Sequence, residues 1–215
     1  MQTIAAYSPQ FALGVYVVFF VFCFVNLVRG VTGKALLLSS VVSLFWVISL
    51  LSPLRDLLAV PLETAALFTW HILLFRAIGF DLYSDNENQK LVRNIARVLA
   101  ATATVTTLIW FSIAFKVANI NSTPVAVGML VLNIGGLVLI EQFARNTLSV
   151  NRWRVRYLNI GLGILFGYGS VLWSIRLGLG DNPSLLQIAQ PAVFALSVPF
   201  ITIASLRNRT NRLRF

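Results

Sequence analysis

Seven apolar segments, each about 20 residues long, are separated by shorter polar or turn-forming stretches along this chain. A helix needs about 20 predominantly apolar residues to cross a hydrocarbon core roughly 30 Å thick. The sequence therefore predicts an all-α, polytopic bundle of seven transmembrane helices. The predicted spans cover residues 9–28, 34–52, 57–79, 94–115, 124–144, 155–177 and 186–206.

Basic residues are concentrated in alternate gaps between these spans, and this pattern predicts an orientation. Lys and Arg accumulate in short cytoplasmic loops near the ends of spans. With the N-terminus outside, only Arg55, Lys116 and Arg176 of the 17 Lys and Arg residues lie on the outer side. The cations then predicted to be cytoplasmic are Arg29, Lys34, Arg76, Lys90, Arg93, Arg97, Arg145, Arg152, Arg154, Arg156, Arg207, Arg209, Arg212 and Arg214. We therefore predict an external N-terminus and a cytoplasmic C-terminus.

The composition leaves little material outside the membrane. Of the 215 residues, 58% are hydrophobic and 11% are charged. We expect residues 1–206 to form one membrane domain and residues 207–215 to form a basic cytoplasmic segment next to the membrane. The formal charge of +10 lies at the borders of the spans, where it suits the anionic headgroups of a bilayer. This placement argues against nucleic acid as a partner.

Several kinds of chemistry are excluded because the residues they need are missing. Cys23 is the only cysteine and His71 the only histidine, so neither an intrachain disulfide nor a multi-histidine metal centre can form. The sequence has no Gly-rich nucleotide-binding motif and no HExxH motif. Lys90 and Lys116 are the only lysines in spans three to seven and their borders, which is unfavourable for a retinal Schiff base. We expect no cofactor, no metal and no catalytic residue in this chain.

Two ionisable residues lie within the third predicted span. Glu63 and His71 are eight residues apart, about 12 Å along a helix and on roughly the same face. Ionisable groups are costly in lipid, so they are candidates for proton sensing or for binding a polar ligand. In the structural alternative, Glu63 lies near the outer border after Pro61, and His71 forms a hydrogen bond with a neighbouring helix.

A charged motif closes the fifth span. Glu141 and Arg145 are four residues apart, in the order that favours an ion pair on a helix. Asn146 follows, and the next gap opens with Arg152 and Trp153, which are typical of an aromatic and cationic belt at the inner interface. We treat these five residues as candidate signalling residues.

Glycines and prolines mark the last two spans. Gly163 and Gly167 form a GxxxG pair, which permits close approach of another helix, either within the bundle or across a dimer. Pro191 and Pro199 each remove one helical hydrogen bond from the last span. They predict a kinked helix that could act as a hinge next to the basic tail.

The region from Glu141 to Gly169, with weaker parallels elsewhere, carries a family resemblance. The matching residues are Glu141-Gln142, Arg145-Asn146, Arg152-Trp153, Arg156-Tyr157-Leu158, Gly161-Leu162-Gly163, Phe166-Gly167-Tyr168 and, near the end, Pro199 and Arg207-Asn208. This pattern resembles the membrane domain of the PrsK-type sensor histidine kinases of bacterial PEP-CTERM/exosortase systems. The chain departs from that family at Gly169, where an Asp is typical, and at Gln190-Pro191, which replace an Ala-Arg-Gly.

The resemblance implies a sensory domain in the bacterial inner membrane. Such a domain would form a homodimer and transmit a membrane or periplasmic signal to a cytoplasmic kinase module or response regulator. The regulated process would be expression of exopolysaccharide and PEP-CTERM genes. His71 cannot be the phosphoacceptor because it lies within a predicted span.

Two other classes of function remain open from the residues. A small transporter or channel could use a polar path formed by Glu63, His71, Asn133 and the Thr102/Thr106 face of span four. A scaffold subunit could dock a partner on the glycines of span six.

Overall fold

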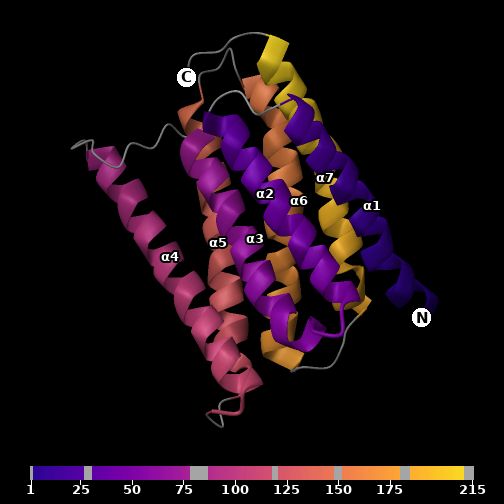
Figure 1. Ribbon diagram of the computed structural model, residues 1–215. Coiled ribbons are helices and arrows are strands. Elements are labelled where there is room, and N and C mark those ends of the chain that lie inside the picture. Colours follow the sequence, from indigo (N-terminus) through magenta and orange to yellow (C-terminus); the bar gives the residue numbers. More distant parts are fainter. Residues whose placement is uncertain are drawn as a thin grey trace.

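In the computed structural model of this chain, the described residues form seven long helices that pack into an elongated bundle (Figure 1). The structure describes residues 2–26, 31–77, 87–117, 121–147, 152–179 and 185–210. The helices are α1 (Gln2–Asn26), α2 (Val31–Leu51), α3 (Arg55–Ala77), α4 (Glu87–Ala114), α5 (Thr123–Asn146), α6 (Arg152–Leu179) and α7 (Leu185–Thr210). Each contains a stretch long and apolar enough to cross a membrane. The prediction of an all-α bundle with seven helices able to span a membrane is confirmed, whereas the orientation of the termini stays a prediction.

Helices are the expected elements because lipid offers no hydrogen-bond partners to a free backbone. The apolar stretches satisfy their amide and carbonyl groups internally, and even Pro9, Pro61, Pro191 and Pro199 lie inside helices. Large apolar side chains on the outer surface, such as Val18, Phe45 and Leu108, remain exposed. Such a surface suits surroundings of lipid rather than water.

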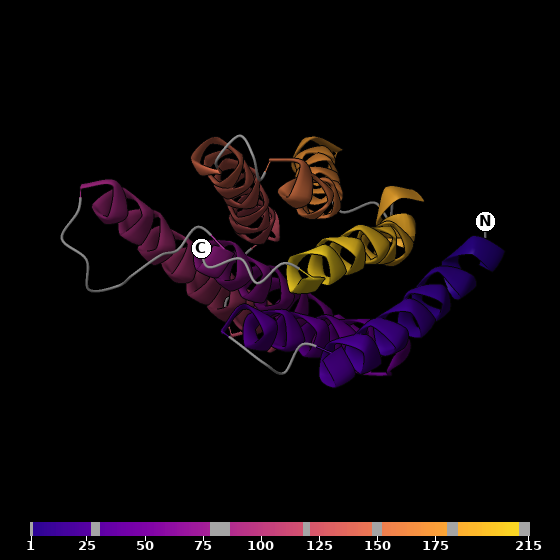
Figure 2. The ribbon, with the colours of Figure 1, turned by 90° about the horizontal axis from the view of Figure 1, so that it is seen from above.

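Six of the helices form a ring in which each packs against its neighbours (Figure 2). Going round, α1 contacts α2, α2 contacts α3, α3 contacts α5, α5 contacts α6, α6 contacts α7, and α7 returns to α1. Helix α4 lies outside this ring, against α3 and α5.

The helices differ strongly in burial. Helix α3 has 56% of its span buried within the protein, whereas α4 has only 17%. Helix α3 therefore contributes most to the interior of the bundle, while α4 presents most of its surface to the surroundings.

The antiparallel order places the cations at one end of the bundle. Helices α1, α3, α5 and α7 end there, and α2, α4 and α6 begin there. We call it the basic end; its described helices carry Lys34, Arg76, Lys90, Arg93, Arg97, Arg145, Arg152, Arg154, Arg156, Arg207 and Arg209. Arg55, Lys116 and Arg176 lie at the opposite end.

Three stretches assigned to gaps or to the tail are helical instead. Residues 87–93 form the first turns of α4, and residues 152–154 begin α6. Helix α7 continues through the expected boundary at residues 206 and 207 to Thr210. Hydropathy marks where a chain leaves the apolar layer, whereas the helix itself continues into the polar border. Residues 211–215 lie outside the described part of the chain.

Candidate functional site

The buried polar residues of α3 form the centre of the candidate site. Glu63, Thr64, Thr69 and His71 are all buried on this helix. Thr64 Oγ1 donates a 2.8 Å hydrogen bond to the Val60 carbonyl, one turn earlier. Thr64 Oγ1 also lies 3.2 Å from Met129 Sδ of α5, and the side chains of Glu63 and His71 reach other helices as well.

Glu63 joins three helices through one carboxylate oxygen. Gln190 Nε2 of α7 donates a 2.6 Å hydrogen bond to Glu63 Oε1, and Trp173 Nε1 of α6 donates to the same oxygen at 3.2 Å. Glu63 is only 5% exposed, Gln190 5% and Trp173 2%. A buried acid with two donors from two helices is a strong constraint on how α3, α6 and α7 pack together.

Arg176 supplies a positive charge beside this cluster. Its guanidinium carbon lies 4.8 Å from the centre of the Trp173 ring, and it is close enough to act electrostatically on the Glu63 carboxylate. Arg176 lies one turn closer than Trp173 to the end of α6. Arg176 is at the end of the bundle opposite the basic end. Glu63 therefore lies toward that end, which agrees with the structural alternative that placed it near a border of its span.

Pro191 lies inside the continuous helix α7, beside the cluster. Proline has no amide hydrogen and disturbs the helical hydrogen bonds around it. On one side of it, the Tyr168 hydroxyl of α6 donates a 2.5 Å hydrogen bond to the Leu186 carbonyl. On the other side, the Ala192 amide donates to Ser8 Oγ of α1 at 3.3 Å. Side chains of α6 and α1 thus bond to the backbone of α7 on both sides of the proline.

His71 lies deeper in the bundle and contacts two helices. Its Nδ1 lies 2.7 Å from the Leu67 carbonyl of the same helix, and its Nε2 lies 3.0 Å from the Leu132 carbonyl of α5. A neutral imidazole carries one N–H, so one of these contacts is a hydrogen bond at a time. Phe166 of α6 packs on the ring with a centroid distance of 4.9 Å. The contact between Nε2 and the Leu132 carbonyl has the geometry of the hydrogen bond with a neighbouring helix that the structural interpretation of His71 predicted.

Asn133 of α5 occupies the space that Gly169 leaves open. Its Nδ2 donates a 2.8 Å hydrogen bond to the Met129 carbonyl, while its Oδ1 is buried without a partner. A Cβ atom at Gly169 would lie 2.0 Å from Asn133 Oδ1. The Asp that the resembled family has at this position would therefore clash with Asn133 in this bundle.

The expected polar path is divided between two places. Thr102 and Thr106 line a groove of about 650 Å³ between α4 and α5, and Glu63 and His71 do not contribute to its lining. They lie inside the ring instead, bonded to other helices.

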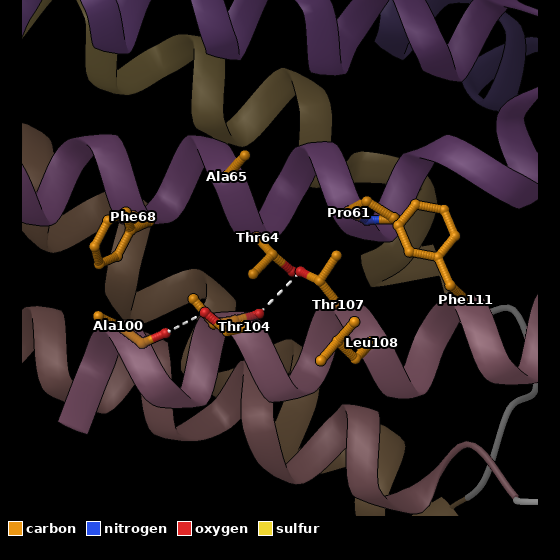
Figure 3. Close-up of a pocket in the computed structure, with 10 residues that line it drawn as sticks. Pro61, Thr64, Ala65, Phe68, Ala100, Thr104, Thr107, Leu108 and Phe111 are labelled. Atoms are coloured by element: carbon orange, nitrogen blue, oxygen red, sulfur yellow. Dashed lines mark hydrogen bonds between the residues drawn. The ribbon is translucent and has the colours of Figure 1, made fainter. Parts of the chain in front are cut away.

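A second groove, of about 410 Å³, lies between α3 and α4 (Figure 3). Figure 3 shows Thr64, Thr104 and Thr107 among its lining residues, with apolar side chains such as Phe68 and Phe111. The Thr104 and Thr107 hydroxyls donate 2.9 Å hydrogen bonds to the carbonyls of Ala100 and Ala103, one turn earlier in α4. These hydroxyls are thus already used by the helix, and the groove is mainly apolar.

The charged motif at the basic end forms its predicted ion pair. Arg145 Nη2 lies 2.6 Å from Glu141 Oε1, and both side chains are largely exposed. They line a groove of about 740 Å³ between α5 and α6, together with Arg156 and Asn159. Asn146, Arg152 and Trp153 are in helices, but their side chains lie outside the described part of the structure.

The predicted close approach at Gly163 and Gly167 within the bundle is wrong. A Cβ atom at either residue would meet nothing within 4 Å. The close approach of α6 to α7 occurs at Gly161, where a Cβ atom would lie 2.8 Å from Ile201 Cγ1 and 3.0 Å from the Ser197 carbonyl oxygen. The GxxxG pair points to a different side of α6, so the dimer alternative stays a prediction.

Sequence reasoning missed Trp173, Gln190 and Arg176 as members of the cluster. Gln190 carried a usable signal, since an amide within an apolar span needs a partner. Trp173 and Arg176 carried none, because a Trp and an Arg near the end of a span are typical interface residues. Among the described residues, no group of three His, Cys, Asp or Glu could hold a metal ion.

Comparison with protein-family models, with curated proteins and with solved structures gave no match for this chain.

Proposed function

We propose that this chain is the sensory membrane domain of a bacterial two-component histidine kinase. The domain would lie in the inner membrane, with its N-terminus outside and its basic end in the cytoplasm. A signal from the membrane or periplasm would pass to a cytoplasmic kinase module or response regulator. The sequence itself has no ATP-binding motif, so phosphorylation belongs to a separate module. From the family resemblance, the regulated genes would be those for exopolysaccharide and PEP-CTERM proteins.

One observation supports the proposal most directly: the buried bond between Glu63 and Gln190, the residue before Pro191. Helix α7 is locally weakened at the proline and held there by side chains of α1, α3 and α6. A change in these contacts would alter how α7 packs, and α7 runs on to the basic end. A two-state packing of this kind is what a signalling helix needs.

The test is to place Glu63→Gln and Gln190→Leu separately in the bacterium that encodes the chain. Glu63→Gln removes the charge but keeps an acceptor, whereas Gln190→Leu removes one donor. We expect both to change transcription of the exopolysaccharide genes while the protein stays in the membrane at normal abundance. Asp56→Asn, at an exposed acid of α3, is the matched control. Normal transcription in both variants, with normal protein abundance, would contradict the proposal.

The transporter alternative is less well supported by the geometry. A conducting path needs polar groups that face a common space, but Thr102 and Thr106 line a groove to which Glu63 and His71 do not contribute. The buried polar groups of α3 instead connect helices. We therefore favour the sensory domain.

A further inference from the structure

The groove between α1 and α7 has a nearly pure apolar lining. It has a volume of about 490 Å³. The residues that line it are Gly14, Val15, Val18, Phe19, Phe22, Val198, Pro199, Thr202 and Ile203. Thr202 is the only residue among them with a polar side chain. Water or a polar solute would gain little here, whereas a hydrocarbon chain would fit the lining.

The groove is open on the outer surface of the bundle. Val18 is 71% exposed and Ile203 38%, and Pro199 and Gly14 are also exposed. A Cβ atom at Gly14 would meet nothing within 4 Å, so the absence of a side chain there keeps part of the groove empty. Its occupant can therefore enter sideways from the membrane.

The groove lies in the half of the bundle that leads to the basic end. On α1 its lining runs from Gly14 to Phe22, and the helix ends at Asn26. On α7 it runs from Val198 to Ile203, and the helix continues to Thr210 with Arg207 and Arg209 in its sequence. The α1 side is about 12 Å long, close to the depth of one leaflet of the hydrocarbon core. The sequence of α7 beyond the groove is thus basic, and basic residues near a membrane surface attract anionic headgroups.

We propose that this groove is a specific binding site for an anionic phospholipid. One acyl chain would lie between α1 and α7 along Pro199, and the phosphate would lie at the basic end. The inference goes beyond the sensory function and does not depend on it, because lipid binding can be measured without any signalling output.

The test uses the full chain in nanodiscs of phosphatidylcholine that contain a phosphatidylglycerol with a photoreactive acyl chain. We expect crosslinks to map to α1 near residues 14–22 and to α7 near residues 198–203. Unlabelled phosphatidylglycerol should compete for them and extra phosphatidylcholine should not. Crosslinks spread evenly over the helices, including the α3–α4 groove of Figure 3, or equal competition by both lipids, would overturn the proposal.

A variant that fills the groove provides the structural control. A Cβ atom at residue 14 meets nothing within 4 Å, so an added ring has room to occupy the groove. Gly14→Phe should therefore exclude the acyl chain and abolish the α1–α7 crosslinks. Gly178→Phe is matched to it, since a Cβ atom there also meets nothing within 4 Å but the residue lies at the opposite end. Gly14→Leu repeats the test with a smaller side chain if the phenylalanine variant does not fold. A folded Gly14 variant that crosslinks like the unmodified chain would overturn the assignment.

The headgroup contribution is tested by the double variant Arg207→Gln/Arg209→Gln. We expect it to keep the crosslinks but to lose the preference of unlabelled phosphatidylglycerol over phosphatidylcholine in competition. An unchanged preference for phosphatidylglycerol would overturn the proposed contact between the headgroup and the basic end.

Discussion

The Gln190 side chain donates a 2.6 Å hydrogen bond to Glu63 across 127 positions of sequence, and both residues are almost completely buried. This contact links α3, the most buried helix, to α7, whose C-terminal turns lie at the basic end. Trp173 donates to the same oxygen from α6. The three helices thus share one acceptor, and removing that acceptor affects all three.

Replacing Glu63 separates the role of its acceptor from the role of its charge. Glu63→Leu leaves the Trp173 and Gln190 donors buried without a partner, and we expect a loss of about 1–3 kcal/mol in the free energy of unfolding. Glu63→Gln keeps one carbonyl oxygen and should lose less. Denaturant titration of the purified protein in detergent micelles measures both values. Asp56→Leu, at an exposed acid of the same helix, is the control, and equal stability of Glu63→Leu and Glu63→Gln would contradict the role given to the acceptor.

The exposed Glu141–Arg145 pair is expected to matter for signalling rather than for stability. Exposed ion pairs of this spacing contribute about 0.3–0.5 kcal/mol, so Glu141→Gln and Arg145→Gln should unfold nearly like the unmodified chain. We expect each to change the transcriptional output while the protein remains in the membrane. Unchanged output in both variants would remove this pair from the signalling site.

The glycines of α6 provide a test of the helix packing. Gly161→Ala should destabilise the protein, because the new Cβ atom would press against Ile201 and the Ser197 carbonyl. Gly163→Ala meets open space and should stabilise the helix by about 0.5–1 kcal/mol. The two unfolding curves should move in opposite directions. A common shift would show that α6 and α7 approach each other elsewhere.

A homodimer through the outer face of α6 can be tested by crosslinking. In a Cys23→Ala background, we expect Gly167→Cys to form a disulfide-linked dimer in native membranes under mild oxidation. Val105→Cys, on the exposed face of α4, should not. A heavier adduct at residue 167 that contains a different protein would favour the scaffold alternative. Monomers alone would contradict the dimer.

Proton flux distinguishes the sensor from a transporter. We expect liposomes that contain the unmodified chain to hold a pH gradient as long as empty liposomes do. His71→Ala liposomes should behave in the same way, because His71 packs helices together through Leu132 and Phe166. A leak that disappears in His71→Ala would assign the chain to transport instead.

Local features were predictable because they depend on neighbours in sequence. The seven spans follow from the length of each apolar stretch, and the Glu141–Arg145 pair follows from its spacing on one helix. Helices α4 and α6 begin at residues 87 and 152, earlier than the predicted spans, because hydropathy marks the apolar layer and not the full length of the helix.

The sequence by itself determined the number of spans, their approximate limits and the concentration of cations at one end. Only the tertiary structure decided that Glu63 meets Gln190 and Trp173, that Gly161 and not Gly163 lies against α7, and that Asn133 fills the space above Gly169. The physical reason is that lipid and protein interior are both apolar. A membrane helix therefore carries no hydrophobic stripe that marks its inner face, and its neighbours are selected by close packing and a few buried hydrogen bonds.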